Sequence, residues 1–334
     1  MPKPHSAEVN LVTGATGFIG GHLVMRLCSM GLKVRALVRN PDKASSLAEL
    51  GIELISGDLC DAESVGKAIE GATRVFHCAG LVSDWGTRQE FHAANVVGTR
   101  NVARAAADAG VRSMVHLSSA SVYGYPRIKN ITEQAPLRSR SIPYIESKIQ
   151  AEYEIRQANE TQGLRSTILR PVMVFGPQCQ NYVGEVTRHL RSGSMLLLDG
   201  GRHVAGLAYV ENVVDAILQA SETPEALNQV LNICDELPVT WKEYIDCLAD
   251  GIGVRRVRFT LPTRVAYPLA MAMETAGKAL RRERRPLLTR LAVLELGQPQ
   301  VYDIGLARRI LGFTPRVSYD EAMHLTLDWI NRQL

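Results

Sequence analysis

A tyrosine and a lysine lie four residues apart in the run PYIESK, as Tyr144 and Lys148. Residues at this spacing share one face of a helix, so the lysine ammonium can lower the pKa of the phenol, which is about 10 when nothing perturbs it. A phenol tuned in this way can take a proton from an alcohol or give one to a carbonyl group. The pair predicts acid–base chemistry on a hydroxyl or carbonyl of a substrate.

Hydroxyl groups that could assist this pair come from the run SSASVYG, residues 118–124, which follows a predicted strand, Ser113–Leu117. A serine at the end of such a strand can hydrogen-bond the reacting oxygen. Tyr123 in the same run has Arg127, and not a lysine, four residues later, so we do not expect it to be the acid–base group. The alternative interpretation is a surface pair on a helix beside a polar turn.

A glycine-rich turn, TGATGFIG, joins the first predicted strand to a helix. The first glycine permits a tight turn, the second lets the backbone approach a pyrophosphate, and the third allows close packing of helix on strand. The start of the helix adds free N–H groups and a partial positive charge for the anion. The alternative is an ordinary tight turn. The predicted dinucleotide contacts here are Gly14, Thr16, Gly17, Phe18, Ile19 and Gly20.

These groups are positioned by an alternation of short β-branched runs and helical patterns. Strands are predicted at 9–12, 33–38, 53–56, 74–78, 113–117 and 166–170, and helices at 17–30, 62–69, 91–108 and 145–161. This alternation predicts an α/β fold with a Rossmann-type, doubly wound parallel sheet that binds ligands at the carboxyl ends of its strands. We expect a dinucleotide-binding domain, 1–177 plus 207–237, and a smaller, mainly helical substrate lobe, 178–206 plus 238–334.

The composition is that of a folded chain, with 46% hydrophobic and 22% charged residues among 334. The net charge is 38 − 34 = +4, and no basic block interleaved with aromatic residues predicts nucleic-acid binding. The six cysteines form no CxxC pair and the histidines are scattered, so we expect reduced thiols and no metal site. No apolar run reaches the length of a transmembrane helix or a signal peptide, which favours a cytoplasmic enzyme.

The GxxGxxG spacing resembles that of the short-chain dehydrogenase/reductase superfamily, and TGATGFIG resembles its extended branch. The resemblance covers nearly the whole chain. It implies that Ser119 is the catalytic serine beside Tyr144 and Lys148, with Ser118 and Ser121 as alternates. It also implies that Asn95 organises the region behind the site. Further implied cofactor contacts are Asp58 and Leu59 at the adenine, Cys78, Ala79 and Gly80 over the middle of the cofactor, and Ser118, Tyr144, Lys148 and Pro171 near the nicotinamide.

The choice between cofactors depends on the end of the second strand. An acid at that position would bond the ribose 2′-hydroxyl of NAD(H), whereas an arginine would accept a 2′-phosphate. The chain has Arg39 there, which favours NADP(H) over NAD(H). The alternative is a solvated arginine that stacks on the adenine of either cofactor.

Five further runs resemble the 3β-hydroxysteroid dehydrogenase-like group: DWG at 84–86, YVEN at 209–212, PVTW at 238–241, RPLLT at 285–289 and LGFTP at 311–315. This resemblance implies alcohol–ketone redox on a hydrophobic small molecule, such as a sterol, a steroid or a long-chain β-hydroxy or β-keto acid. The expected substrate contacts are Val82, Trp85, Ser119 and Tyr144.

Two other functions stay open at this point. A nucleotide-sugar epimerase, reductase or dehydratase shares the N-terminal half, but such enzymes typically carry an arginine where this chain has Ala205; Arg202 could substitute for it. A dinucleotide-sensing binding module is the second alternative. Modules of that kind tend to lose the tyrosine–lysine pair, which is intact here.

The helix predicted over 265–280 is rich in alanine and methionine and is followed by the basic run RRERR at 281–285. One interpretation is an adaptable cover over a lipid-like pocket, with a weak peripheral membrane contact through the basic end. The other is a core-facing helix whose solvated basic end complements its dipole. A homodimer is compatible with the sequence.

Overall fold

The computed structural model describes residues 8–128 and 130–333, and its centre is a seven-stranded parallel sheet. Its strands run in the order β10-β6-β5-β4-β1-β2-β3, so the order reverses between β1 and β4. This confirms the predicted doubly wound α/β fold, with its switch point between those two strands. The strands are β1 (Val9–Thr13), β2 (Lys33–Val38), β3 (Glu53–Ser56), β4 (Arg74–His77), β5 (Ser113–Leu117), β6 (Ser166–Pro171) and β10 (Val230–Ile233).

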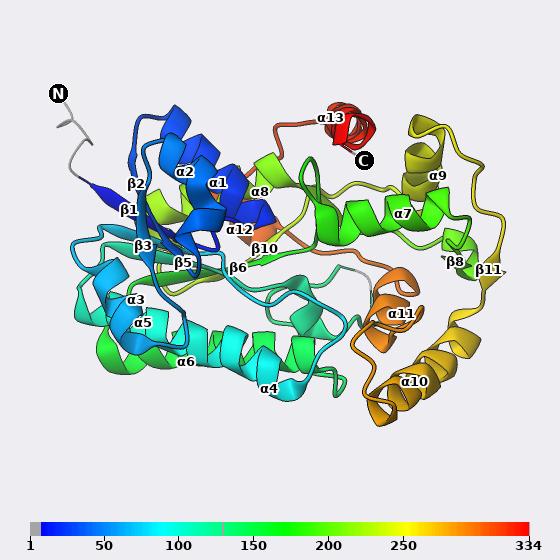
Figure 1. The fold of residues 1–334 in the computed structure, drawn as a ribbon, viewed down its shortest axis with the longest axis horizontal. Helices are drawn as coiled ribbons and strands as arrows, with labels where there is room; N and C mark the ends of the chain where they lie inside the picture. Colours follow the sequence, from blue (N-terminus) through cyan, green and yellow to red (C-terminus); the bar gives the residue numbers. More distant parts are fainter. Residues whose placement is uncertain (1–7, 129, 334) are drawn as a thin grey trace.

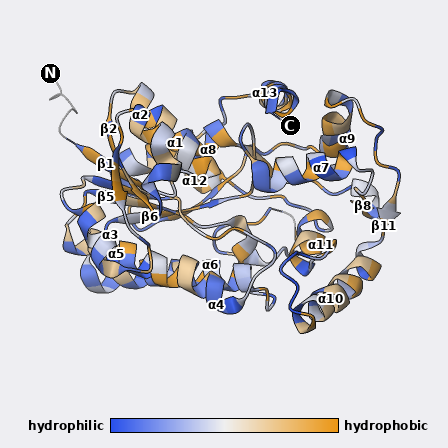
Figure 2. Ribbon diagram, in the orientation of Figure 1, coloured by the Kyte–Doolittle hydropathy of each residue, from blue (hydrophilic) through white to orange (hydrophobic). Residues whose placement is uncertain are grey.

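Helices cover both faces of the sheet, which is why every residue of β1, β4, β5 and β6 is buried (Figures 1 and 2). One layer contains α3 (Ala62–Ile69), α5 (Gly98–Asp108) and α6 (Pro143–Gln162), and the other contains α1 (Phe18–Ser29), α8 (Val210–Glu222) and α12 (Gly305–Leu311). The short α2 (Ser45–Glu49) lies between β2 and β3.

The strand register brings the carboxyl ends of three strands to one level. Thr13, the last residue of β1, pairs with Leu37 on one side and with His77 on the other. The segments that follow β1, β2 and β4 therefore leave the sheet side by side. This is the edge at which the glycine turn, Arg39 and Cys78 were expected to meet.

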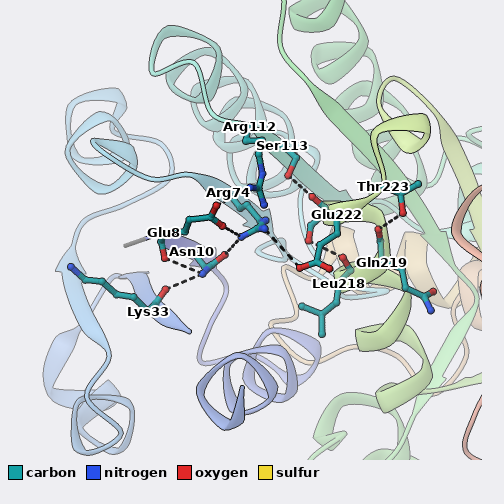
Figure 3. Close-up of polar contacts among 11 residues, drawn as sticks. Glu8, Asn10, Lys33, Arg74, Arg112, Ser113, Leu218, Gln219, Glu222 and Thr223 are labelled. Carbon is teal, nitrogen blue, oxygen red and sulfur yellow. Dashed lines mark hydrogen bonds and ion pairs between the residues drawn. The ribbon is translucent and has the colours of Figure 1, made fainter. Parts of the chain in front are cut away.

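The opposite edge of the sheet is held by buried charges (Figure 3). Arg74 is 3% exposed and donates to Glu8 Oε2 at 2.6 Å, while Arg112 donates to Glu8 Oε1 at 2.8 Å. Asn10 Nδ2 donates to the Lys33 carbonyl at 3.1 Å, which ties β1 to β2. Arg74 also lies 3.8 Å from Glu222 Oε1 at the end of α8, so this cluster joins β4 to the segment before β1 and to α8, and we assign it a structural role.

The helix predicted over 91–108 is not a regular α-helix along its whole length. It begins as α4 (Arg88–Phe91), passes through a π-helical stretch over His92–Val97, and continues as α5. A π-helical turn inserts an extra residue into the helix and re-aims its side chains, and such turns are frequent at functional sites. Asn95 lies in this stretch.

The remaining elements form a second body beside the carboxyl edge of the sheet (Figure 1). Two small parallel pairs, β7 with β9 and β8 with β11, are surrounded by helices around Trp241, Tyr244 and Phe175. Residues 302–313, expected in the substrate lobe, instead pack into the core of the sheet through Ile304, Ala307 and Phe313. The bounds are β7 (Met173–Phe175), α7 (Glu185–Arg191), β8 (Leu197–Leu198), β9 (Leu207–Tyr209), α9 (Trp241–Gly251), β11 (Thr260–Leu261), α10 (Thr263–Ala279), α11 (Arg290–Leu296) and α13 (Tyr319–Gln333).

Within the described residues, no helix combines the length and the apolar character needed to cross a membrane. Residues 1–7, which include most of the terminus used for the signal-peptide expectation, lie outside the described residues.

Candidate active site

The turn after β1 requires glycine at two positions. Gly14 has φ +73°, and a Cβ atom on it would lie 2.7 Å from the Ala79 backbone nitrogen. A Cβ atom on Gly20 would lie 2.1 Å from the Gly14 carbonyl oxygen. The Gly17 N–H donates to the same oxygen at 2.9 Å and closes the turn. The turn therefore lies against the end of β4 with no room for side chains.

The N-terminus of the helix that follows has no acidic side chain in its first turn to offset the positive end of the helix dipole. Gly17 is the N-cap of α1, makes no side-chain cap, and is followed by no acidic residue in the first turn. Thr16 and Gly17 are exposed, whereas Phe18 and Ile19 are partly buried. Free N–H groups and a positive helix end beside an exposed turn suit an anion such as a pyrophosphate.

The turn after β3 is rigid and lies beside the end of β2. Asp58 Oδ1 accepts from the Cys60 N–H at 2.8 Å, and the Asp58 N–H donates to Ser64 Oγ at 3.1 Å. The Gly57 N–H donates to the Val38 carbonyl at 3.0 Å, so the exposed Arg39, which follows Val38, lies beside this turn. Leu59 packs beneath, where a Cβ atom on Gly98 would lie 3.0 Å from it.

The segment after β4 is fastened to α6 through Asn95. The Leu81 N–H donates to Asn95 Oδ1 at 2.7 Å, and Asn95 Nδ2 donates to Ser147 Oγ at 2.9 Å. A Cβ atom on Gly80 would lie 3.1 Å from Asn95 Oδ1 and 3.4 Å from Lys148 Nζ. The structure therefore brings together Gly80, Asn95 and Lys148, as the resemblance implied.

Tyr144 and Lys148 lie on one face of α6, and both are buried, at 8% and 5% exposure. Burial raises the pKa of Tyr144 to about 12, against a lowering by the nearby hydroxyls of Ser119 and Ser121. Burial lowers the pKa of Lys148 to about 8, and Glu152 opposes that shift. The expected lowering of the phenol pKa by Lys148 is not seen, because burial dominates and the ammonium donates to the Leu117 carbonyl at 2.8 Å.

The three serines after β5 have different surroundings. Ser118 Oγ donates to Glu152 Oε1 at 2.6 Å and so points into the protein, which argues against it as the catalytic alternate. Ser119 Oγ accepts from the Ser121 N–H at 3.2 Å and lies close to the phenol of Tyr144. Ser121 Oγ is buried without a partner at hydrogen-bond distance. Ser119 and Ser121 are the hydroxyls placed to reach an oxygen held by Tyr144.

The network behind Ser118 was missed in the sequence. Glu152 and Arg170 form a buried two-pronged ion pair with bonds of 2.8 and 2.6 Å, and Arg170 also donates to Tyr123 OH at 2.8 Å. Tyr123 OH in turn donates to Asn232 Oδ1 at 2.6 Å, so this tyrosine has a structural role, consistent with the expectation that it is not the acid–base group. Two charges in otherwise apolar positions were the only signal for this network.

A comparison with known protein families identifies the family of this chain. The sequence model of the NAD dependent epimerase/dehydratase family matches residues 10–234. The chain belongs to this family. Its members are nicotinamide-dependent enzymes, and the resemblance to extended short-chain dehydrogenases/reductases is thereby confirmed.

Curated members of the epimerase/dehydratase family match along nearly the whole chain. A ketoreductase of Stigmatella aurantiaca, named for 4-hydroxy-2-methyl-3-oxo-4-farnesyl-3,4-dihydroquinoline-1-oxide, is 32% identical over 93% of each chain. The 2-alkyl-3-oxoalkanoate reductase of Shewanella oneidensis is 30% identical over 93% of this chain and 84% of its own. The human sterol-4-alpha-carboxylate 3-dehydrogenase, decarboxylating, is 28% identical over 95% of this chain and 86% of its own.

Solved structures show the same fold. The structure of gox2253 has a TM-score of 0.81 at 26% identity and covers 97% of this chain and 98% of its own. MoeE5 in complex with UDP-glucose and NAD has a TM-score of 0.77 at 26% identity, over 97% and 99% of the two chains.

In this epimerase/dehydratase family member, Tyr144 lies in an apolar cluster that the sequence did not predict. The Phe91 ring meets the Tyr144 ring edge-on, with centroids 6.1 Å apart. Leu291 and Leu294 of α11 pack into the same cluster, with Tyr267 of α10 at its margin. The remaining members are Tyr125, Ile142, Ile145, Leu81 and Ile149.

A carboxyl group also reaches this cluster. Glu295 accepts from Tyr125 OH at 3.2 Å, and burial raises the pKa of Glu295 to about 7. Its charge contributes to the raised pKa of Tyr144. Position in the sequence gave no indication of this residue, because it is 151 residues away from Tyr144 and is brought in by packing of the second body.

The predicted substrate residues have mixed outcomes. Trp85 and Tyr144 line one small cavity, together with Phe91 and with charged side chains of α10 and α11, Glu274, Lys278 and Arg290. Val82 is 57% exposed and does not line it, and neither does the segment 178–206. Trp85 Nε1 donates to the Arg282 carbonyl at 3.2 Å. Pro171 ends β6 in a buried position, paired with Ile233.

Proposed function

We propose that this chain reduces a ketone to a secondary alcohol on a hydrophobic substrate, at the expense of a nicotinamide dinucleotide. The observation that carries the proposal is the position of the Tyr144 phenol, between serine hydroxyls on one side and the apolar side chains of Phe91, Leu291 and Leu294 on the other. A site with a few polar groups at the reacting end and apolar walls suits an apolar ketone. The named ketoreductase and oxoalkanoate reductase relatives support it.

The catalytic roles follow from the surroundings of each group. Ser119 would hold the carbonyl oxygen of the substrate by donating a hydrogen bond, and Tyr144 would donate its phenolic proton to that oxygen. Lys148 would hydrogen-bond the ribose beside the nicotinamide and favour the phenolate that Tyr144 leaves behind. When bound, the dinucleotide supplies the hydride. A phenol whose pKa is raised to about 12 is protonated at neutral pH, which is the form that can donate a proton to a carbonyl oxygen.

We propose NADP(H) as the preferred cofactor. Arg39 is exposed at the end of β2, on the side of the Asp58 turn, where a 2′-phosphate would need a cation. The proposed cofactor contacts are the residues expected from the sequence, except that the Ser118 hydroxyl is engaged by Glu152 and leaves only its backbone for a ligand. The division into 1–177 plus 207–237 and 178–206 plus 238–334 remains a proposal, with 302–313 packed on the sheet.

A nucleotide-sugar enzyme is the second candidate, because similar structures contain UDP-sugars. Ala205, at the position where such enzymes typically carry an arginine, is fully buried in the apolar core of the second body. Arg202, the substitute considered from the sequence, is exposed. The buried alanine disfavours a nucleotide phosphate at this place, whereas the exposed Arg202 leaves the substitute available.

The test is oxidation of NADPH by the purified chain with three substrates: a long-chain 3-oxo ester, a steroidal 3-ketone and UDP-glucose. We expect turnover with at least one of the two apolar ketones and none with the UDP-sugar, and loss of turnover in Tyr144→Phe. Epimerisation of UDP-glucose, with no reduction of either ketone, would overturn the proposal.

A further inference from the structure

The outward face of α10 is apolar, although it does not face the core. Val265, Leu269 and Leu280 are 49%, 44% and 65% exposed and lie on one face of the helix, since they are spaced by four and eleven residues. Met271, at 54% exposure, lies on the other flank of the exposed side of the helix, because six residues separate it from Val265. A helix on the surface of a globular protein normally turns polar residues outward. With Phe259 before the helix and Leu287 after it, these residues form what we call the α10 surface.

The α10 surface stands out from the rest of the chain. Six of the fourteen large hydrophobic side chains that are exposed in the described residues belong to it: Phe259, Val265, Leu269, Met271, Leu280 and Leu287. α10 itself lies at the outer edge of the molecule beside α11, with hydrophobic residues along its length (Figures 1 and 2). Exposed apolar side chains gathered along one element in this way point to an interaction site.

Charge around the α10 surface indicates the partner. Residues 255–290 contain ten arginines and lysines and two glutamates, a net charge of 10 − 2 = +8, while the whole chain has +4. The rest of the chain therefore sums to −4. Several of these cations are exposed without an ion pair among the described residues: Arg255, Arg258, Arg264, Arg281, Arg282 and Arg284.

We propose that the α10 surface docks on an anionic lipid membrane. An apolar helix face bordered by cations is the pattern of helices that lie in the headgroup region, where the apolar side chains enter the acyl boundary and the cations attract anionic lipids. A second copy of this chain would bring one strongly basic segment against another and is disfavoured by repulsion. Nucleic acid would leave the apolar side chains without a partner.

The opposite face of α10 reaches the candidate active site. Tyr267 packs at the margin of the cluster around Tyr144, and a Cβ atom on Gly277 would lie 3.0 Å from the Trp85 ring. One helix therefore separates the α10 surface from the catalytic tyrosine. A ketone dissolved in the membrane would therefore reach Tyr144 from the side on which the protein docks. This last step rests on the proposed function, whereas the docking itself does not.

The experiment is flotation of the full chain with vesicles, one set of phosphatidylcholine alone and one of phosphatidylcholine with phosphatidylglycerol in a two-to-one ratio. We expect binding to the anionic vesicles only, weakening as salt is added. The double variant Val265→Ser/Leu269→Ser and the double variant Arg281→Glu/Arg284→Glu should each lower the bound fraction by about tenfold or more. Met25→Ser and Arg309→Glu are matched controls, since both side chains are exposed elsewhere.

The result is independent of the reductase assay. Wild type that stays off anionic vesicles overturns the docking proposal, even if ketone reduction is observed. A dimer that dissociates in Leu269→Ser, without vesicle binding, would make a second copy the partner and would also overturn it. Vesicle binding without ketone reduction would support the docking proposal and contradict the proposed function. Thermal unfolding of each variant verifies that these exposed substitutions leave the fold intact.

Discussion

Asn95 Nδ2 donates a hydrogen bond of 2.9 Å to Ser147 Oγ, and Ser147 Oγ donates one of 2.7 Å to the Tyr144 carbonyl. The π-helical stretch is thereby fastened to the first turn of α6, which contains Tyr144, the proposed catalytic tyrosine. Asn95 also holds both backbone groups of Leu81. Its amide thus positions two sides of the site without touching the reacting atoms.

We predict that Asn95→Ala lowers kcat about tenfold or more, because small displacements of a catalytic group are costly. It should also lower the free energy of unfolding by about 1–3 kcal/mol, since the Leu81 N–H loses its partner. Ser147→Ala separates the two roles of Asn95: it removes the same bond between Asn95 and Ser147, but it leaves the hydrogen bonds of Leu81 intact. The two effects on kcat should not add in the double variant. Full additivity would contradict the positioning role of this bond.

Much of the fold was predictable, for reasons visible in particular elements. β2, β3, β5 and α3 have the predicted bounds, because each is a short run with a clear period between turn residues. The π-helical stretch was not predictable, since His92–Val97 is too short for a shift of one residue in the apolar pattern to be recognised. The packing of residues 302–313 on the sheet was not predictable either, because it is a long-range contact that local sequence patterns do not show.

The candidate site divides in the same way. Residues that follow strand ends, such as Gly14, Gly80 and Ser119, could be placed because parallel strands end at one edge. Leu291, Leu294 and Glu295 could not, because only the folding of α11 against the sheet domain brings them to Tyr144. The pKa shifts of Tyr144 and Lys148 could not be predicted either, since burial, and not the spacing of the two residues, determines their direction.

Tyr144→Phe should lower turnover by about 10²–10⁴-fold, the usual contribution of a positioned acid–base group. Binding of the dinucleotide should be nearly unchanged, because the ring is kept and only the hydroxyl is lost. Tyr153→Phe serves as the control, since Tyr153 lies on the same helix and is 64% exposed. Steady-state kinetics and cofactor titration by fluorescence would test both points. Near-normal turnover in Tyr144→Phe would refute the assigned chemistry, whereas Lys148→Ala should impair both binding and turnover.

Arg39→Asp should shift the preference from NADP(H) toward NAD(H). The substitution removes a cation that would bond the 2′-phosphate and places a carboxylate that repels it and suits a ribose hydroxyl. Dissociation constants of both cofactors for wild type and variant are the measurement. Arg309→Asp makes the same charge change at another exposed position and should leave the ratio unchanged. Tighter binding of NAD(H) than of NADP(H) by the wild type would defeat the cofactor proposal.

Glu295 should make stability depend on pH. Burial raises its pKa from 4.5 to about 7, so between these values the folded state holds a proton that the unfolded state releases. Stability from this group is present below pH 4.5 and is lost as the pH rises through 7. Wild type should therefore lose stability relative to Glu295→Gln between pH 5 and pH 8, as measured by urea unfolding. A difference between the two proteins that is constant with pH would show that Glu295 does not titrate in this window.

Trp85 provides the test of substrate size. Its ring lines the same cavity as Tyr144 and packs on α10, with Lys278 Nζ 5.8 Å from the ring centre. A large ring beside the site can contact an extended or fused-ring hydrocarbon that a short ketone does not reach. Trp85→Ala should therefore raise KM for a long-chain or steroidal ketone more than for a short one.

Trp241→Ala is no useful control, because Trp241 is buried in the core. Trp85→Phe is better, since it keeps an aromatic ring and should retain most of the preference. If Trp85 only joins its loop to α10, Trp85→Ala would lower the melting temperature and change both KM values by the same factor.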